Sequence, residues 1–274
     1  MSSPLISAEE LKELTDDPIL VLIDATGGPT SRNEYQQSHL LNARYVDCNT
    51  QLANIEKDPA QGGRHPLPTA EQFHRTIRDL GINQNSHIVI YDRLNGANSA
   101  ARLWWMLKSI GHKNVQVLDG GFQLAVGCGY PTSVVETSFK KGTDYNRIEW
   151  NWPLATLEDV EKASISQNKT IIDVRESGRY KGEYEPLDLV AGHIPGAKNI
   201  YFAQNLNDDG TFKTAEELST FYKNSLVDSD LDNLIVHCGS GITACHTILA
   251  FARAALPIPE LYVGSWSEWS RNKL

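Results

Sequence analysis

Cysteine is scarce in this sequence. The four cysteines, Cys48, Cys128, Cys238 and Cys245, are sparse for a chain of 274 residues, and no two of them form a CxxC motif. This usage argues against a disulfide scaffold and against a structural zinc site, so we expect neither a metal nor another cofactor. A reducing, cytoplasmic setting is the simplest interpretation, because it would keep the thiols free.

Long apolar runs and an excess of positive charge are also missing. No run of about 18 apolar residues occurs, so we expect no membrane-spanning helix and no membrane partner. The formal net charge of −9 disfavours a nucleic-acid partner. The first residues lack a basic region followed by an apolar core, so we expect no signal peptide. The composition, 41% hydrophobic and 22% charged, is typical of a globular protein long enough for two domains.

The two halves of the chain share one pattern. An apolar run ending near Asp24 resembles a later run ending near Asp173, and the run 88–92 resembles the run 234–238. Further matches join 39–43 to 193–197, 69–73 to 214–218, and 119–122 to 263–266. Matches that recur at a nearly constant offset indicate a duplication.

Each half alternates short apolar runs with helical patterns. The first half predicts strands at 19–24, 88–91 and 115–118, and helices at 70–80 and 97–110. Short β-branched runs between polar turns are typical of buried parallel strands. The sequence therefore predicts an α/β fold of two tandem domains, each a parallel sheet flanked by helices on both faces.

We place the first domain at residues 1–135 and the second at 154–274. The intervening segment 136–153 is polar and charged, which is typical of a linker. Trp150 and Trp152 lie within it, and we expect these aromatic side chains to pin the linker to a domain.

The segment Cys238-Gly239-Ser240-Gly241-Ile242-Thr243 is placed for chemistry. It follows an apolar run and precedes a helical stretch at 244–255, so Cys238 stands at a strand-to-helix turn. The two glycines let the backbone curl, and the inward N–H groups and the helix N-terminus can then stabilise a negative charge on sulfur. The thiolate is the nucleophilic form of cysteine. A buried core cysteine is the alternative interpretation.

Asp92 occupies the position in the first half that Cys238 occupies in the second. An aspartate cannot act as a sulfur nucleophile, so the first domain is predicted to be catalytically silent. We expect Asp92 to cap a helix or hold a turn rather than to take a direct part in catalysis.

These residues together resemble a known family. Two α/β repeats, a cysteine loop in the second only, and the motifs 192–197 (GHIPGA) and 264–269 (GSWSEW) are similar to two-domain rhodanese sulfurtransferases. The nearest branch is the one that contains 3-mercaptopyruvate sulfurtransferases and bacterial thiosulfate sulfurtransferases. The resemblance implies that Cys238 takes a sulfane sulfur from thiosulfate or 3-mercaptopyruvate as a persulfide. The acceptor would be cyanide or a thiol, with a thioredoxin-like protein as one candidate, and we expect a monomer.

The resemblance also implies binding residues. The loop amides of Gly239, Gly241, Ile242 and Thr243 would hold the charge of the persulfide. Arg179 matches the family's substrate arginine in a Gly-Arg-Tyr context, and a surface salt bridge is its alternative role.

Related enzymes of the mercaptopyruvate type have a second arginine just after a Glu-Pro. Here Glu185-Pro186 is followed by Leu187-Asp188-Leu189, which favours thiosulfate. Arg64 and Arg93 are candidate extra cations near the site, although we expect each to be a solvated surface charge.

Two further matches suggest a proton relay. His65, in the Pro- and Gly-rich segment 62–68, and Ser240 match relay residues of the family, whereas the relay aspartate falls at Asn49, close to Asp47. A surface histidine is an equally good interpretation of His65. Ser240 and Gly241 stand where the thiosulfate branch has basic residues, which favours mercaptopyruvate.

Other nearby residues have simpler interpretations. His237 either orients the cysteine loop or is a satisfied histidine at a strand end. Cys245 is expected to pack in the core, with a resolving thiol as the alternative. Cys48 and Cys128 are expected to be inert.

Two rival functions remain open to comparison. A cysteine-dependent phosphatase needs Cys-x5-Arg, but position 244 is Ala244, which argues against this function. A sulfur-relay or binding module with incidental turnover is the second rival, since its acceptor would be another protein.

Overall fold

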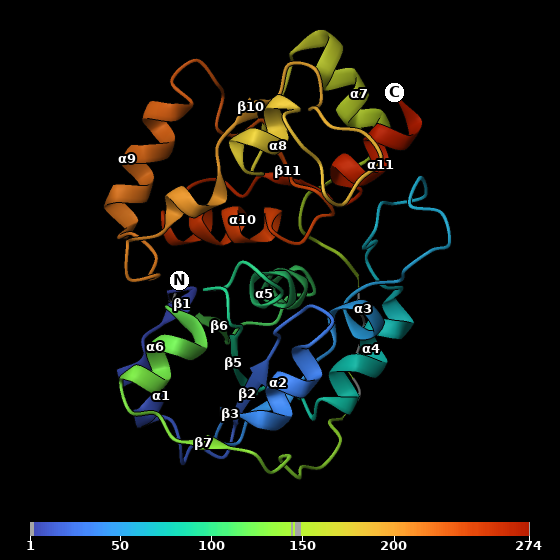
Figure 1. Ribbon diagram of the computed structural model, residues 1–274. Helices are drawn as coiled ribbons and strands as arrows, with labels where there is room; N and C mark the ends of the chain where they lie inside the picture. The colour runs from blue at the N-terminus through green and yellow to red at the C-terminus, as the bar shows by residue number, and fades with distance from the viewer. Residues whose placement is uncertain (1–2, 144, 146–148, 274) are drawn as a thin grey trace. The chain divides into compact units, whose positions relative to one another are not determined.

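The computed structural model describes residues 3–143, 145 and 149–273, which form two compact units. The first unit consists of residues up to Asn54, Pro68–Asn151 and Asp208–Thr211 (Figure 1). The second consists of Ile55–Leu67, Trp152–Asn207 and Phe212–Leu274. The segment 55–67 therefore belongs to the second unit, although the residues on both sides of it in the sequence belong to the first.

The first unit is built on a five-stranded parallel sheet. Its order is β1 (Leu5–Ile6), β6 (Val115–Leu118), β5 (His87–Tyr91), β2 (Leu20–Asp24) and β4 (Arg44–Tyr45). The central strands are apolar and buried because helices cover the sheet. A separate antiparallel pair joins β3 (His39–Leu40) to β7 (Thr132–Ser133).

The helices of the first unit connect these strands in a strand–helix alternation. They are α1 (Ala8–Glu13), α2 (Ser31–Gln37), α3 (Cys48–Gln51), α4 (Ala70–Asp79), α5 (Ala100–Ser109) and α6 (Gly121–Gly127). Thr69 starts α4 with a capping box, since its side chain accepts from the N–H of Gln72 and the Gln72 side chain accepts from the N–H of Thr69. Trp150 packs against Phe73 and Trp105, which confirms that this part of the expected linker is held by a domain.

The second unit repeats the same sheet. Its order is β10 (Lys198–Asn199), β9 (Thr170–Asp173), β11 (Leu234–His237), β12 (Glu260–Tyr262) and β8 (Leu154–Ala155), all parallel. Read from the opposite end, this is the order of the first sheet strand for strand, so the duplication seen in the sequence extends to topology.

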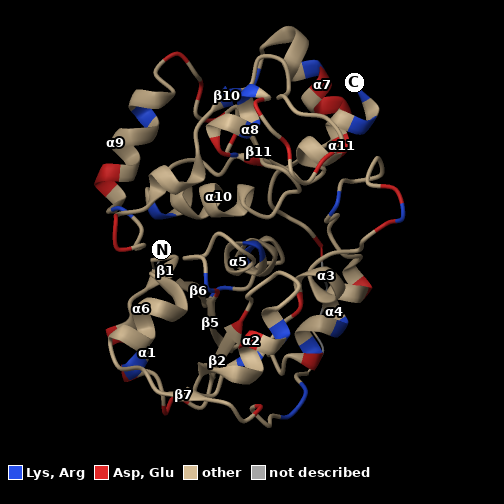
Figure 2. Cartoon of the chain, in the orientation of Figure 1, with Lys and Arg blue, Asp and Glu red and all other residues tan. Residues whose placement is uncertain are grey.

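Helices lie on both faces of the second sheet. They are α7 (Leu157–Ser166), α8 (Ser177–Lys181), the 3-10 helix η1 (Phe202–Asn205), α9 (Ala215–Ser225), α10 (Ala244–Arg253) and α11 (Ser265–Asn272). Ile171 and Ile235 pack with Val160 of α7 and Trp266 of α11 on one face. On the other face α10 packs on β11, α9 and η1. Figure 2 shows α10 without an acidic or basic residue before Arg253, as its burial requires.

These units confirm the predicted α/β fold with a parallel sheet in each repeat. The domain boundaries at 135/136 and 153/154 stay predictions, and residues 144 and 146–148 of the expected linker lie outside the described residues. Within the described ranges, no helix is both long and apolar enough to cross a membrane.

Candidate active site

Cys238 directly follows β11, at the carboxyl end of the central strand of the second sheet. Open α/β sheets bind ligands at this edge. The backbone around the cysteine is fixed by α11, because the N–H of Trp266 donates to the Cys238 carbonyl at 3.0 Å. The Cys238 N–H in turn donates to Ser265 Oγ at 3.2 Å, and Ser267 N–H donates to the Gly239 carbonyl at 3.0 Å. The Gly-Ser-Trp-Ser motif thus holds the cysteine loop in place.

Gly241 is the residue that allows the loop to turn. Its φ is +74°, in the left-handed region, and a Cβ there would lie 2.5 Å from the Val263 carbonyl oxygen. Only glycine fits both constraints. The Gly241 carbonyl accepts from the Cys245 thiol at 3.4 Å, and Cys245 is fully buried, as expected for core packing.

The loop presents backbone donors to the space beside the sulfur. Counting only bonds between described residues, the N–H groups of Gly239, Ser240 and Thr243 donate to no protein acceptor. Such donors, together with the start of α10 at Ala244, form a concave site that favours a bound anion.

The equivalent loop of the first unit shows the same kind of site filled. The Asp92 carboxylate is fully buried and accepts five backbone N–H bonds of 2.8 to 3.1 Å. The donors are Leu94, Gly96, Asn98, Ser99 and Ala100. The expectation that Asp92 holds a turn is confirmed. In the first unit the Asp92 side chain fills this concave site, whereas in the second unit the corresponding residue is Cys238, which carries a thiol.

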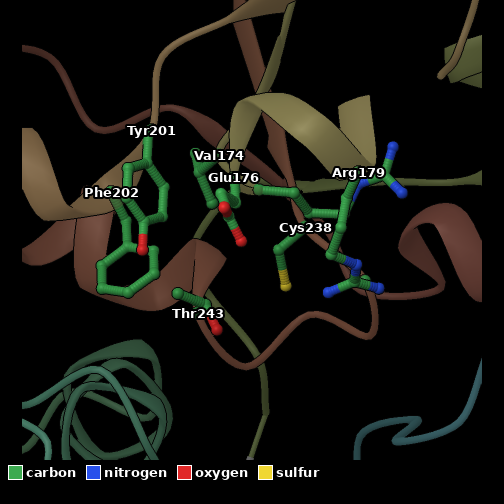
Figure 3. A pocket seen from close by; sticks show the side chains of 9 residues that line it. Val174, Glu176, Arg179, Tyr201, Phe202, Cys238 and Thr243 are labelled. Atoms are coloured by element: carbon green, nitrogen blue, oxygen red, sulfur yellow. The ribbon is translucent and has the colours of Figure 1, made fainter. Parts of the chain in front are cut away.

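A pocket of about 190 Å³ opens at the cysteine loop (Figure 3). In Figure 3 the Cys238 sulfur lies between Arg179 on one side and the aromatic rings of Tyr201 and Phe202 on the other. The complete lining is Val174, Arg175, Glu176, Arg179, Tyr201, Phe202, Cys238, Gly239 and Thr243. Cys238 is only 3% exposed, so a donor must enter this pocket to reach the sulfur.

Arg179, on α8, is held by a buried carboxylate. Its Nη2 lies 2.7 Å from Glu185 Oε1, and its Nε donates to Glu185 Oε2 at 3.2 Å. Burial alone would raise the pKa of Glu185, but hydrogen bonds from Arg179 and from the Leu187 and Asp188 N–H groups lower it. The Glu185 carboxylate therefore stays charged and orients the guanidinium. Arg179 is both ion-paired and part of the pocket wall.

Arg64 and Arg93 are not the solvated surface charges that the sequence led us to expect. The Arg64 side chain is 20% exposed and lies 2.5 Å from the fully buried carboxylate of Asp188. The Arg93 side chain is 18% exposed, lies 3.7 Å from the Phe122 ring centroid, and donates to the Ser38 carbonyl in the first unit. Tertiary packing, not composition, removes both from solvent.

The residues predicted for the site fall into two groups. Cys238, Gly239, Thr243 and Arg179 line the pocket together. The other four do not line the pocket that the described residues form. Three of them, Ser240, Gly241 and Ile242, belong to the cysteine loop. The fourth, His65, is next to Arg64 in the segment 55–67 of the second unit.

Asp47, the acidic residue two positions before Asn49 in the sequence, has a structural task in the first unit. Asp47 caps α3, since its Oδ1 accepts from the N–H and the hydroxyl of Thr50, both at 2.8 Å. A relay through His65 and Ser240 stays a prediction.

His237 is buried beneath the loop. Its Nδ1 lies 3.1 Å from the Cys238 carbonyl oxygen, and its Nε2 lies 3.7 Å from Asp173 Oδ2. Burial lowers the pKa of His237 more strongly than the Asp173 charge raises it, so the ring is neutral near pH 7. A neutral ring with its proton on Nδ1 donates to the Cys238 carbonyl, which supports a role in orienting the loop.

Several pocket residues were not found from the sequence. Glu176 follows the Asp173-Val174-Arg175 run, and Tyr201 and Phe202 follow the strand after the GHIPGA motif. Their positions directly after strands of the repeat were the available signal. Within the described ranges, no group of three or more His, Cys, Asp and Glu side chains is arranged to hold a metal ion.

Comparison with known proteins identifies this architecture. A family model described as a rhodanese-like domain matches residues 7–126 and again 156–272. A protein named "Probable 3-mercaptopyruvate sulfurtransferase" from Pseudomonas aeruginosa is 36% identical over 277 residues, covering 98% of this chain and 95% of the relative. A thiosulfate sulfurtransferase from Rattus norvegicus is 34% identical over 97% of this chain and 90% of its own length.

A solved structure agrees with these relatives. The 3-mercaptopyruvate sulfotransferase SseA from Escherichia coli superposes with a TM-score of 0.81 at 31% identity, covering 97% of this chain and all of that one. The match spans both units and the cysteine loop. The chain therefore belongs to the rhodanese family, as an enzyme of the sulfurtransferase class.

Proposed function

We propose that the protein moves a sulfane sulfur from a small anionic donor to a thiophilic acceptor through a persulfide on Cys238. The observation that carries the proposal is the pairing of Cys238 with unused loop N–H donors and with Arg179 in one pocket. The loop around Asp92 supports it, because five backbone N–H groups of that equivalent loop converge on one carboxylate.

The first half-reaction balances without a cofactor. The Cys238 thiolate attacks the outer sulfur of thiosulfate, a sulfur–sulfur bond to Cys238 forms, and sulfite leaves with the electron pair of the broken bond. With 3-mercaptopyruvate, the carbon–sulfur bond breaks instead, and pyruvate leaves after taking up a proton. The loop amides of Gly239, Ser240 and Thr243, which donate to no protein acceptor among the described residues, would stabilise the charge on the persulfide.

The second half-reaction regenerates the thiolate. Cyanide or a thiolate attacks the outer sulfur, and Cys238 leaves as a thiolate, so the products are thiocyanate or a new persulfide. Ser240 and His65 would supply or remove the proton where the donor or acceptor needs one.

The relatives do not favour one donor over the other. Some are named for 3-mercaptopyruvate and others for thiosulfate, and their sequence identities to this chain are similar. Steady-state kcat/KM should therefore be measured with thiosulfate and with 3-mercaptopyruvate, using cyanide as acceptor. Cys238→Ser should lose transfer from both donors, and Cys128→Ser, which changes a half-buried thiol of the first unit, should match the wild type. Substantial transfer by Cys238→Ser would overturn the proposal.

A protein acceptor is the second candidate. Leu187 and Leu189 are 61% and 77% exposed in the segment that follows Glu185, the partner of Arg179. Exposed apolar side chains beside an active site suit a protein partner, and a thioredoxin-like protein is the acceptor we would test first. Persulfide mass before and after mixing with reduced thioredoxin separates this acceptor from cyanide.

We also propose a cytoplasmic monomer, testable by light scattering and cell fractionation.

A further inference from the structure

The proposed reaction leaves one charged residue of the pocket, Glu176, without a role. Three charged side chains line the pocket, namely Arg175, Glu176 and Arg179. The Arg175 side chain is only 1% exposed and is bound to the buried carboxylates of Asp173 and Glu185, so its charge is satisfied inside the fold. Glu176 and Arg179 therefore carry the two charges that an entering molecule meets.

These two charges face the reactive sulfur from different directions. In Figure 3 the Glu176 carboxylate points into the pocket on the side of Tyr201, and Arg179 lies on the other side of the Cys238 sulfur. Burial and then the Glu176 charge raise the pKa of Tyr201, which agrees with a carboxylate close to that ring. A molecule at the sulfur is thus placed between a negative group and a positive one.

Glu176 is held in place without being neutralised. It precedes α8 as the N-cap residue, but its side chain does not cap that helix. Its Oε2 instead accepts a hydrogen bond from the Tyr184 hydroxyl, and a neutral hydroxyl orients a carboxylate while leaving its charge. Across the described ranges, no Lys, Arg or His side chain forms an ion pair with Glu176. Because the residue is exposed, this charge stands where molecules enter the pocket.

The pocket is small and has one apolar wall. Its volume is about 190 Å³, below the roughly 300 Å³ at which sites for drug-sized molecules begin. Val174, Tyr201 and Phe202 supply aliphatic and ring surface on which a short hydrocarbon stem can pack. Such a site admits a thiol of a few carbon atoms, and the second functional group of that thiol then lies close to one of the two charges.

We propose that Glu176 selects the sulfur acceptor by charge and favours small thiols that carry an ammonium group. The inference rests on the proposed function and concerns its second step. The acceptor thiol loses its proton to water and its sulfur attacks the outer sulfur of the persulfide. Cys238 then leaves as a thiolate, and the acceptor keeps the transferred sulfur. Glu176 makes and breaks no bond, but it attracts an ammonium group on the incoming thiol and repels a carboxylate.

Three thiols with the same short stem test this preference. Cysteamine carries an ammonium group, 2-mercaptoethanol is neutral, and 3-mercaptopropionate carries a carboxylate. The persulfide is formed with thiosulfate or 3-mercaptopyruvate, the donor is removed, and the loss of the added sulfur to each thiol is followed by intact mass at low ionic strength. Because no donor is present, the rate constants report the acceptor step alone.

Glu176→Gln removes the charge and keeps an oxygen that can accept from Tyr184. The rate constant should fall for cysteamine, rise for 3-mercaptopropionate and stay the same for 2-mercaptoethanol. Each change should be about two- to five-fold, as for charge pairs open to water, so the ratio of cysteamine to 3-mercaptopropionate should fall about four- to twenty-five-fold. Comparing each thiol with itself across variants cancels its intrinsic nucleophilicity. In wild type, added salt should reduce the same ratio.

Glu183→Gln is the matched control. Glu183 is an exposed glutamate directly before Tyr184 and does not line the pocket that the described residues form, so its loss changes the net charge equally. This variant should keep the wild-type ratio. Glu176→Asp, which retains the charge, should keep most of the preference. Circular dichroism checks the fold of each variant.

Three outcomes would overturn the inference. An unchanged ratio in a folded Glu176→Gln would show that the carboxylate does not act on acceptors, and an equal change in Glu183→Gln would assign the effect to overall charge. Equal slowing with all three thiols would mean that Glu176 only supports the shape of the pocket. If the wild-type protein forms no persulfide, the proposed function fails instead, and that result is distinguishable because it precedes the addition of any acceptor.

Discussion

Replacing Gly241 with alanine tests whether the curl of the cysteine loop is required. An L-residue in the left-handed region costs about 1–2 kcal/mol, and the added methyl would lie 2.5 Å from the Val263 carbonyl oxygen and 2.9 Å from Val263 Cα. These are backbone atoms of the short connection between β12 and α11, so they cannot move aside as the end of a flexible side chain could. We expect Gly241→Ala to lower the free energy of unfolding by about 2 kcal/mol or more.

Gly239→Ala is the matched control within the same loop. Its added methyl meets only the ends of flexible side chains, Arg64 Nη2 at 3.1 Å and Arg179 Nη2 at 3.4 Å. Gly239 is not in the left-handed region, so its backbone accepts alanine. We expect a change in stability below about 1 kcal/mol, with a raised donor KM because both guanidinium groups must shift.

Thermal melting followed by tryptophan fluorescence distinguishes the two variants. At about 2–4 °C per kcal/mol, Gly241→Ala should melt at least about 4 °C lower than wild type and lose most sulfur transfer. Gly239→Ala should melt close to wild type. A Gly241→Ala variant that melts normally and retains full activity would refute the account of the loop.

Two further predictions concern buried groups outside the pocket. Burial lowers the pKa of His237 from its ordinary value of 6.5. As the pH falls below about 6.5, His237 is therefore protonated in the unfolded chain but stays neutral in the folded protein. This difference in proton binding lowers the free energy of unfolding. When the free energy of unfolding is plotted against pH between about 6.5 and 5, the slope should therefore be smaller in His237→Gln than in wild type, by up to about 1.4 kcal/mol per pH unit. An unchanged slope would mean that the ring is charged in the folded state. Asp92→Ala leaves buried N–H donors without their acceptor. The free energy of unfolding, measured with urea, should fall by about 3 kcal/mol or more. The rate of sulfur transfer per folded molecule should stay unchanged. Asp92→Asn, which keeps one oxygen, should lose less, and a loss of transfer in the folded variant would show that the first repeat is not silent.

The repeat and the cysteine loop could be predicted from the sequence because their signals are local. Apolar runs ending near Asp24 and Asp173 and the change from Asp92 to Cys238 are legible along the chain. The strand order of the two sheets agrees with that duplication. The need for glycine in the loop was legible too, but the sequence did not show that Gly241, and not Gly239, adopts the left-handed conformation.

The arginines of the site were harder to predict because they depend on packing between distant segments. The motif around His65 placed Arg64 near the site, but nothing in the sequence indicates that Asp188 will be buried opposite Arg64. Composition favours exposure for an arginine in a Gly- and Pro-rich segment, and the ion pair overrides that preference. Tyr201 and Phe202 were missed for a similar reason, since a pocket wall formed by a 3-10 helix has no periodic signal.

The most direct test of the central claim is the mass of the protein after exposure to a sulfur donor. The protein is incubated with thiosulfate or 3-mercaptopyruvate, freed of donor, and analysed intact and as peptides. The account predicts one added sulfur atom on the peptide that contains Cys238, removed by cyanide and absent in Cys238→Ser. No added sulfur with either donor, or sulfur carried on Cys48, Cys128 or Cys245 instead, would contradict it.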